Sequence, residues 1–173
     1  ANSIKSNLIT GVVYASSTEA AFRSTGSGNL TSTDIWEYYN GAEWVTATSA
    51  PSGTNNNITI SAGHTIALDG NFTVGTGKTL TVAGTINLAG NVISGAGSFV
   101  LNSAATLKLG NNVSIAVAIT TTTTTLNAGA NYFFDGTTVA QHTGGLPGST
   151  LSTSSANGSQ NYTTTLTGNI TVS

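Results

Sequence analysis

The sequence predicts an all-β fold, a three-sided parallel β-helix (β-solenoid) of about 20 residues per coil with an N-terminal aromatic β-hairpin cap region. Three observations lead to this prediction. Helical periodicity is almost absent, because Gly, Asn and Thr interrupt every long window. After residue 57, short runs of β-branched residues alternate with Gly or Asn. Apolar residues in every third run also repeat at a shared interval.

This shared interval links three interleaved series of apolar residues, with steps of 19 to 22 residues. A three-strand unit of this length cannot bury its apolar edge alone and therefore stacks on its neighbours. The series are Ile58, Leu80, Phe99, Ile119, Val139; Ile66, Ile86, Leu107, Leu126; and Phe72, Val92, Val113, Tyr132. An antiparallel sandwich also has short strands and glycine turns, but it gives no reason for three series with one period.

The apolar members of these series should form the core. We expect three members of the series, Leu80, Ile86 and Leu107, to be buried in stacked rungs, together with Leu109, two residues after Leu107. The chain then divides into residues 1–57 as an N-terminal strand and cap, residues 58–145 as solenoid coils, and residues 146–173 as a Ser/Thr/Asn-rich strand segment that continues the coils.

The segment WEYYNGAEWV predicts the hairpin of the cap region. Asn40-Gly41 favours a two-residue type I′ turn between strands 35–39 and 42–46. This turn would place Trp36 opposite Val45 and Trp44 opposite Glu37. A hairpin here could cover the backbone groups that the end of a solenoid exposes. A second interpretation is a platform for stacking sugar rings, made of Trp36, Tyr38, Tyr39 and Trp44.

Composition limits the function classes. Only 6% of the 173 residues are charged, so Thr, Ser and Asn must wet the surface. The net charge of -2 and the four basic residues give no footprint for nucleic acid or an anionic membrane. No apolar stretch is long enough to span a bilayer. The chain has no Cys, which excludes disulfides and Cys-based metal sites.

Residues able to support catalysis are sparse, and we expect no enzymatic activity and no cofactor. The six acids do not form a recognisable pair, and Asp69 and Asp135 each precede a Gly, as turn residues do. His64 and His142 lack a third ligand at a metal-binding spacing. Neither a GxSxG motif nor a complete phosphate loop is present.

Five segments of the chain carry a resemblance to a known class of proteins: SGNLTSTDIWEYYNGAEW, NITISAGHTI, TLTVAGTINL, GSFVLNSAATLKLG and LNAGANYFFDG. In this order they resemble β-solenoid segments of large surface proteins from the Bacteroidota phylum, over residues 24–147. The resemblance implies a secreted protein, exported by the type IX route, with an adhesive or surface-layer role. It supplies no catalytic residues.

The function that we expect is a structural or adhesive module of the bacterial cell surface, extracellular after signal-peptide cleavage before Ala1. The alternative is a carbohydrate-binding module that contacts surface polysaccharide through the aromatic residues. Ice binding is less favoured, although six Thr residues occupy positions 120–125. The outward positions expected between core residues are Thr59, Thr81 and Val100 on one side and Ala67, Asn87 and Lys108 on another, which makes a broken array.

The expected partner is another copy of the chain or further coils of a longer one. The N-terminal segment SNLITGVVYA is unusually apolar for a terminus. Its residues Leu8, Ile9, Val12 and Val13 could donate a strand to a neighbouring subunit. Such a head-to-tail contact does not close on itself, so it would build a filament.

Overall fold

The computed structural model describes residues 20–110, 114–134, 146–147, 150–154, 160–163 and 166–172. Its elements are strands apart from one four-residue helix, α1 (Ile115–Ala118), so the all-β prediction is confirmed for this part of the chain. None of the helices in the described residues is long and apolar enough to cross a membrane.

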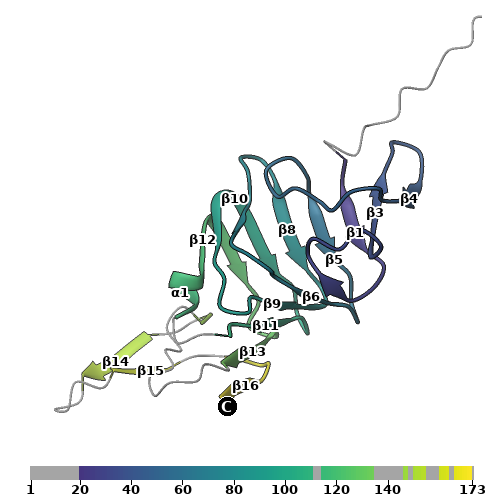
Figure 1. Cartoon of the computed structure of the whole chain (residues 1–173). Coiled ribbons are helices and arrows are strands. Elements are labelled where there is room, and N and C mark those ends of the chain that lie inside the picture. The colour runs from purple at the N-terminus through teal and green to yellow at the C-terminus, as the bar shows by residue number, and fades with distance from the viewer. Residues whose placement is uncertain are drawn as a thin grey trace, which may run out of the picture.

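Most strands belong to two sheets; in Figure 1 the strands of sheet A run steeply downward, and those of sheet B run across near their lower ends. Sheet A has the order β12 (Ile119–Leu126), β10 (Ile93–Leu101), β8 (Thr79–Val82), β5 (Ile58–Ile60), β1 (Phe22–Ser24), β3 (Trp36–Tyr39) and β4 (Trp44–Thr46), with β7 (Phe72–Thr73) beside β10. Sheet B has the order β16 (Ile170–Val172), β13 (Asn131–Phe134), β11 (Thr106–Lys108), β9 (Thr85–Asn87), β6 (Thr65–Ala67) and β2 (Gly28–Asn29). A separate pair joins β14 (Thr150–Ser154) to β15 (Gln160–Thr163).

From β5 through β8 to β10 in sheet A, and from β6 through β9 to β11 in sheet B, neighbouring strands are parallel and in the predicted register. Ile58 aligns with Leu80 and Leu80 with Phe99 in sheet A. In sheet B the same holds for Ile66 and Ile86, and Ile86 aligns with Leu107. The first three members of two predicted series are therefore confirmed.

The predicted register is wrong after residue 110. Phe99 aligns with Thr124 instead of Ile119, and Leu107 aligns with Tyr132 instead of Leu126. The physical reason is the helical turn α1, which adds chain before β12 and lengthens both steps to 25 residues.

Other members of the late series pair elsewhere. Ile119 aligns with Ile93, and Leu126 aligns with Leu101. In the third series, Phe72 aligns with Ile93, one residue past the predicted Val92. Val113 and Val139 lie outside the described residues.

A third set of parallel pairs connects β7 with the first residues of β10 and β12. Thr73 aligns with Ser94, and Ser94 with Thr120. The register shifts after Gly95, where the backbone has a φ of 115°. A Cβ atom at Gly95 would lie 2.3 Å from the carbonyl oxygen of Val74, so glycine lets the neighbouring strands approach here. Long strands β10 and β12 thus take part in two sets of pairs each.

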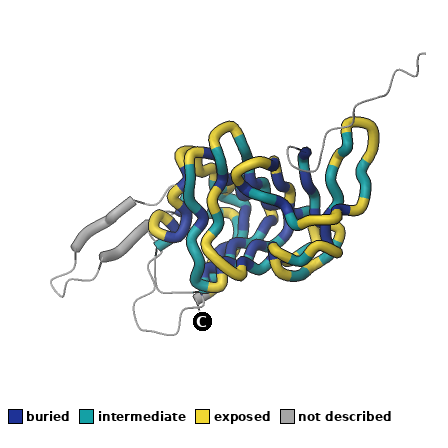
Figure 2. The backbone as a smooth tube through the Cα atoms, turned by 45° about the horizontal axis from the view of Figure 1, so that its top comes forward, coloured by how far each residue is buried: buried dark blue, intermediate teal, exposed yellow. Residues whose placement is uncertain are grey.

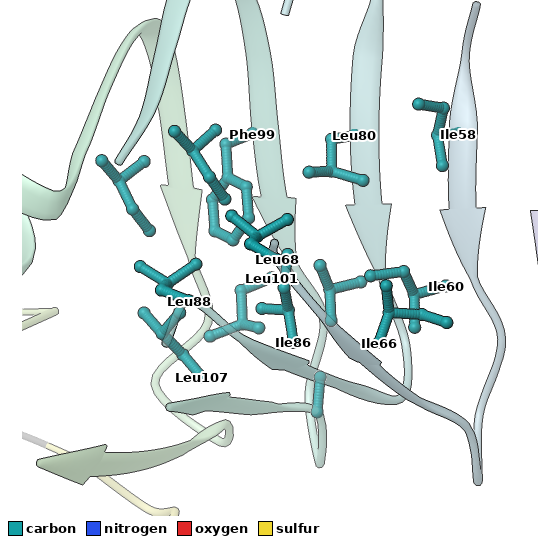
Figure 3. Close-up of a cluster of buried hydrophobic side chains, with 14 of the residues drawn as sticks. Ile58, Ile60, Ile66, Leu68, Leu80, Ile86, Leu88, Phe99, Leu101 and Leu107 are labelled. Atoms are coloured by element: carbon teal, nitrogen blue, oxygen red, sulfur yellow. The ribbon is translucent and has the colours of Figure 1, made fainter. Parts of the chain in front are cut away.

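Apolar side chains between the two sheets form one continuous core, shown as dark blue stretches in Figure 2 and as sticks in Figure 3. The alternation of side chains along each strand sends every second residue into this space. Leu80, Ile86, Leu107 and Leu109 are all buried, as predicted. The core extends into sheet B through Tyr132, whose hydroxyl donates a hydrogen bond to the carbonyl of Asn127 at 2.8 Å.

The predicted aromatic hairpin is present, but its turn and register differ from the prediction. β3 pairs antiparallel with β4, so that Tyr39 faces Trp44 and Tyr38 faces Val45. Residues 40–43 form the connection, because the Asn40 side chain accepts hydrogen bonds from the backbone N–H groups of Ala42 and Glu43. This side-chain bonding favours a four-residue loop over the expected two-residue turn. β3 also pairs with β1, so the hairpin extends sheet A (Figure 1).

Candidate functional site on the outer face of sheet A

The outer face of sheet A carries two columns of aligned, mostly hydroxyl-bearing side chains. Successive residues of a strand point to opposite faces, so the residues between the buried ones face outward. Register places Thr59, Thr81, Val100 and Thr125 in a first column and Thr79, Ser98 and Thr123 in a second. None of these seven side chains is charged, and all are exposed or half-buried. We call this surface the hydroxyl face.

Asn57 lies beside the second column and fixes its first strand. The side-chain oxygen of Asn57 accepts a hydrogen bond from the backbone N–H of Thr79 at 2.9 Å. Asn57 is itself exposed. This bond joins the corner before β5 to the start of β8. It therefore adds a side-chain hydrogen bond to the backbone hydrogen bonds that hold these two strands together.

Aromatic and charged side chains continue the outer face beyond β5, beginning with Arg23 of β1, which aligns with Thr59. The Tyr39 and Trp44 rings have centroids 5.6 Å apart, and Tyr39 is 38% exposed. The Arg23 guanidinium lies 4.3 Å from the Trp44 ring centroid and donates two hydrogen bonds to Glu37, at 3.0 and 2.8 Å. Arg23 therefore covers part of Trp44 and leaves Tyr39 as the more open ring.

The four aromatic residues singled out from the sequence thus fall on two sides of the sheet. Trp36 is fully buried, and its indole N–H donates to the carbonyl of Leu30 at 3.2 Å. Tyr38 packs against the core, with its ring centroid 6.0 Å from that of Phe22. Trp36 therefore stabilises the cap region and is not part of a ligand platform. The alternation of side chains along the strand WEYY could have predicted this, because it places Trp36 and Tyr38 on one face and Tyr39 on the other.

Polar side chains at the corners have structural partners. His64 Nδ1 lies 2.9 Å from the hydroxyl of buried Ser24, which also accepts a hydrogen bond from the N–H of Ser61. Thr31 donates a hydrogen bond to Asp69. Among the described residues there is no group of three or more His, Cys, Asp or Glu side chains that could hold a metal ion. Asp135 and His142 lie outside them.

The β12 end of sheet A is open in the part of the chain that the structure describes, since no described strand pairs with the outer edge of β12. A hollow of about 400 Å³ lies beside this strand, lined by Ile115, Ala116, Ile119, Thr124, Leu126 and Pro147. Apolar lining next to a free strand edge is the arrangement that another strand could complete. The proposed donor residues Leu8, Ile9, Val12 and Val13 lie outside the described residues.

No protein-family model, curated protein or solved structure matches this chain.

Proposed function

We propose that the chain is a non-enzymatic structural or adhesive module of a bacterial cell surface, built as a three-sided parallel β-solenoid. The observation that carries this proposal is the parallel register of three sets of strands, β5–β8–β10, β6–β9–β11 and β7–β10–β12. Ladders of this kind hold their outward side chains at fixed spacings. A stiff body whose hydroxyl face is uncharged suits repeated weak contacts with a surface.

Engineered disulfides test the solenoid, and the chain has no Cys of its own to interfere. Thr59 and Thr81 are aligned neighbours, so the Thr59→Cys, Thr81→Cys double variant should cross-link on mild oxidation. Thr59→Cys with Val100→Cys spans two strand spacings, about 9 to 10 Å. That control pair exceeds the Cα separation of roughly 7 Å that a disulfide tolerates, and it should stay reduced. Cross-linking of both pairs, or of neither, would argue against the register.

Retention of protein-coated beads under flow tests adhesion. We expect beads that carry the wild-type chain to be held on hydroxyl-rich surfaces such as silica or cellulose more strongly than bare beads. Thr81→Lys, on the hydroxyl face, should weaken retention, while Thr85→Lys on sheet B should not. Retention equal to that of bare beads on every surface would contradict an adhesive role and leave only the structural one.

Self-assembly is part of the same proposal and is supported by the outer edge of β12, which pairs with no described strand, and by the apolar hollow beside it. A strand from a second copy would pair with this edge and repeat the contact head to tail. Electron microscopy of the purified chain should then show filaments. Deletion of residues 1–14 should abolish them if this segment supplies the strand, and filaments that persist would exclude strand donation by it.

Carbohydrate binding is the second candidate, and the exposed Tyr39 ring beside Trp44 favours it. Amphipathic rings of this kind stack on the apolar faces of sugars. On a glycan array, Tyr39→Ala and Trp44→Ala should lose binding. Tyr38→Phe is the matched control, because Tyr38 packs inward and its ring is kept. Binding that survives both alanine substitutions would contradict this candidate.

A further inference from the structure

We propose that the hydroxyl face of sheet A binds the surface of ice. The sequence alone predicts a broken array, because Val100 interrupts the Thr residues on one side and Ala67, Asn87 and Lys108 occupy another. Register adds Thr125 to the first column and supplies the whole second column, Thr79, Ser98 and Thr123. Six of the seven positions therefore carry a hydroxyl group, and the seventh, Val100, keeps the β-branched shape.

The spacing of the two columns forms a nearly rectangular grid. Neighbouring strands lie about 4.8 Å apart, and alternate residues of one strand lie roughly 6.6 Å apart. A regular grid of this kind can meet the ordered oxygen lattice of an ice crystal at several positions at once. Thr side chains are stiff at χ1, so their methyl and hydroxyl groups keep fixed positions on the grid. Little conformational entropy is then lost when the face meets an ordered lattice.

Charge on the hydroxyl face also matches an ice surface, which is neutral and offers both donors and acceptors. The hydroxyl groups can donate and accept hydrogen bonds, and none of the seven positions is charged. A charged side chain would instead hold its own strongly bound water and break the lattice contact. Many weak contacts on one rigid body then add up to firm attachment.

The outer face of sheet B provides an internal contrast. It has one Thr column, formed by Thr65, Thr85 and Thr106. Its second column holds Ala67, Asn87, Lys108 and Phe133, which differ in size and include a charge. Lys108 lies 4.7 Å from the Phe133 ring centroid, so this column stands as an uneven ridge. Sheet B therefore lacks the two-column grid and should not bind ice.

The test is inhibition of ice recrystallisation by the purified full chain, with ice-crystal shape as a second readout. Wild type should keep the crystals small and faceted. Thr81→Lys should abolish this effect, whereas Thr85→Lys, the same substitution at a half-buried outward position of sheet B, should leave it unchanged. Val100→Thr completes the first column and should strengthen inhibition. Circular dichroism would check that each variant is folded.

Three outcomes would overturn the proposal. One is a wild-type chain that leaves recrystallisation unchanged. Another is equal loss in Thr81→Lys and Thr85→Lys, which would indicate a general effect of added charge. The last is Thr81-dependent pelleting with insoluble chitin or cellulose in the absence of any effect on ice. That result would assign the hydroxyl face to a polysaccharide and leave the proposed adhesive function standing.

Discussion

The second halves of β10 and β12 hold aligned side chains in different environments. Phe99 and Leu101 of β10 are 0% and 1% exposed, while their partners in β12, Thr124 and Leu126, are exposed and half-buried. β10 has β8 on one side and β12 on the other, whereas β12 has a described partner on one side only. In the second half of β12, where only one side of the strand has a described neighbour, burial is therefore lost, whereas Ile119 and Thr121 in its first half remain buried.

Alanine substitutions at aligned positions of β10 and β12 should give the largest difference in stability. Phe99→Ala removes a ring packed between two neighbouring strands and should lower the free energy of unfolding by about 3 to 5 kcal/mol. Leu126→Ala removes a half-buried side chain and should cost about 1 kcal/mol. Urea denaturation followed by circular dichroism measures both. Equal losses would mean that something covers Leu126 as fully as Phe99.

Sheet B sharpens the comparison, because its strand β13 has β16 as an outer neighbour. Tyr132 of β13 is accordingly 1% exposed, and burial raises its pKa from 10.0 to about 12. The unfolded chain loses this proton first, so stability that is complete below pH 10 should fall as the pH rises toward 12. The difference of two pKa units corresponds to about 2 to 3 kcal/mol.

Comparison with Tyr132→Phe isolates this contribution. The variant loses a hydrogen bond to Asn127 and should be about 1 kcal/mol less stable than wild type at pH 8. Its stability should fall less between pH 10 and 12, because it has no buried phenol to ionise. Parallel pH profiles of the two proteins, measured by urea denaturation, would show that Tyr132 is not shielded by β16.

The hairpin at the other edge of sheet A should give the smallest effect. Arg23 and Glu37 form a part-buried ion pair at 2.8 Å, with substantial exposure of both side chains. Glu37→Gln should therefore cost no more than about 1 kcal/mol, and the difference should shrink as salt is added. Denaturation at low and high ionic strength measures it. A larger loss that salt does not change would indicate that the pair is needed to hold the hairpin on β1.

Strand register could be predicted from the sequence in the regular middle of the ladder. The prediction failed where extra residues lengthen a coil. From Ile58 to Leu109 the corners are short, so each apolar residue returns after a nearly constant step. The turn α1 breaks this constancy, and it has only four residues, with no side-chain capping hydrogen bond from its N-cap residue Ser114. In the following run of six Thr, shifting the register by one residue places Thr opposite the same partners, so the sequence does not distinguish one alignment from another.

The candidate site was only partly predictable for the same reason. Thr59, Thr81 and Val100 could be placed outward by their position between apolar neighbours. Thr123 and Thr125 could not, because their partners in β10 depend on the register of the Thr run. In the hairpin, the Asn-Gly pair predicted where the turn lies, but the Asn40 side chain accepts hydrogen bonds from two backbone N–H groups of a longer loop, and Trp44 pairs with Tyr39 instead of Glu37.

The long connection between β1 and β5 makes this part of the molecule suitable for the insertion of additional sequence. Phe22 aligns with Ile58 although 36 residues separate them, and the hairpin occupies this interval without disturbing the alignment. The entropic cost of closing a loop grows only with the logarithm of its length, so further residues at the exposed tip between Asn40 and Glu43 add little. A peptide epitope or a small enzyme could be grafted at this tip and carried at one edge of the molecule, away from the hydroxyl face.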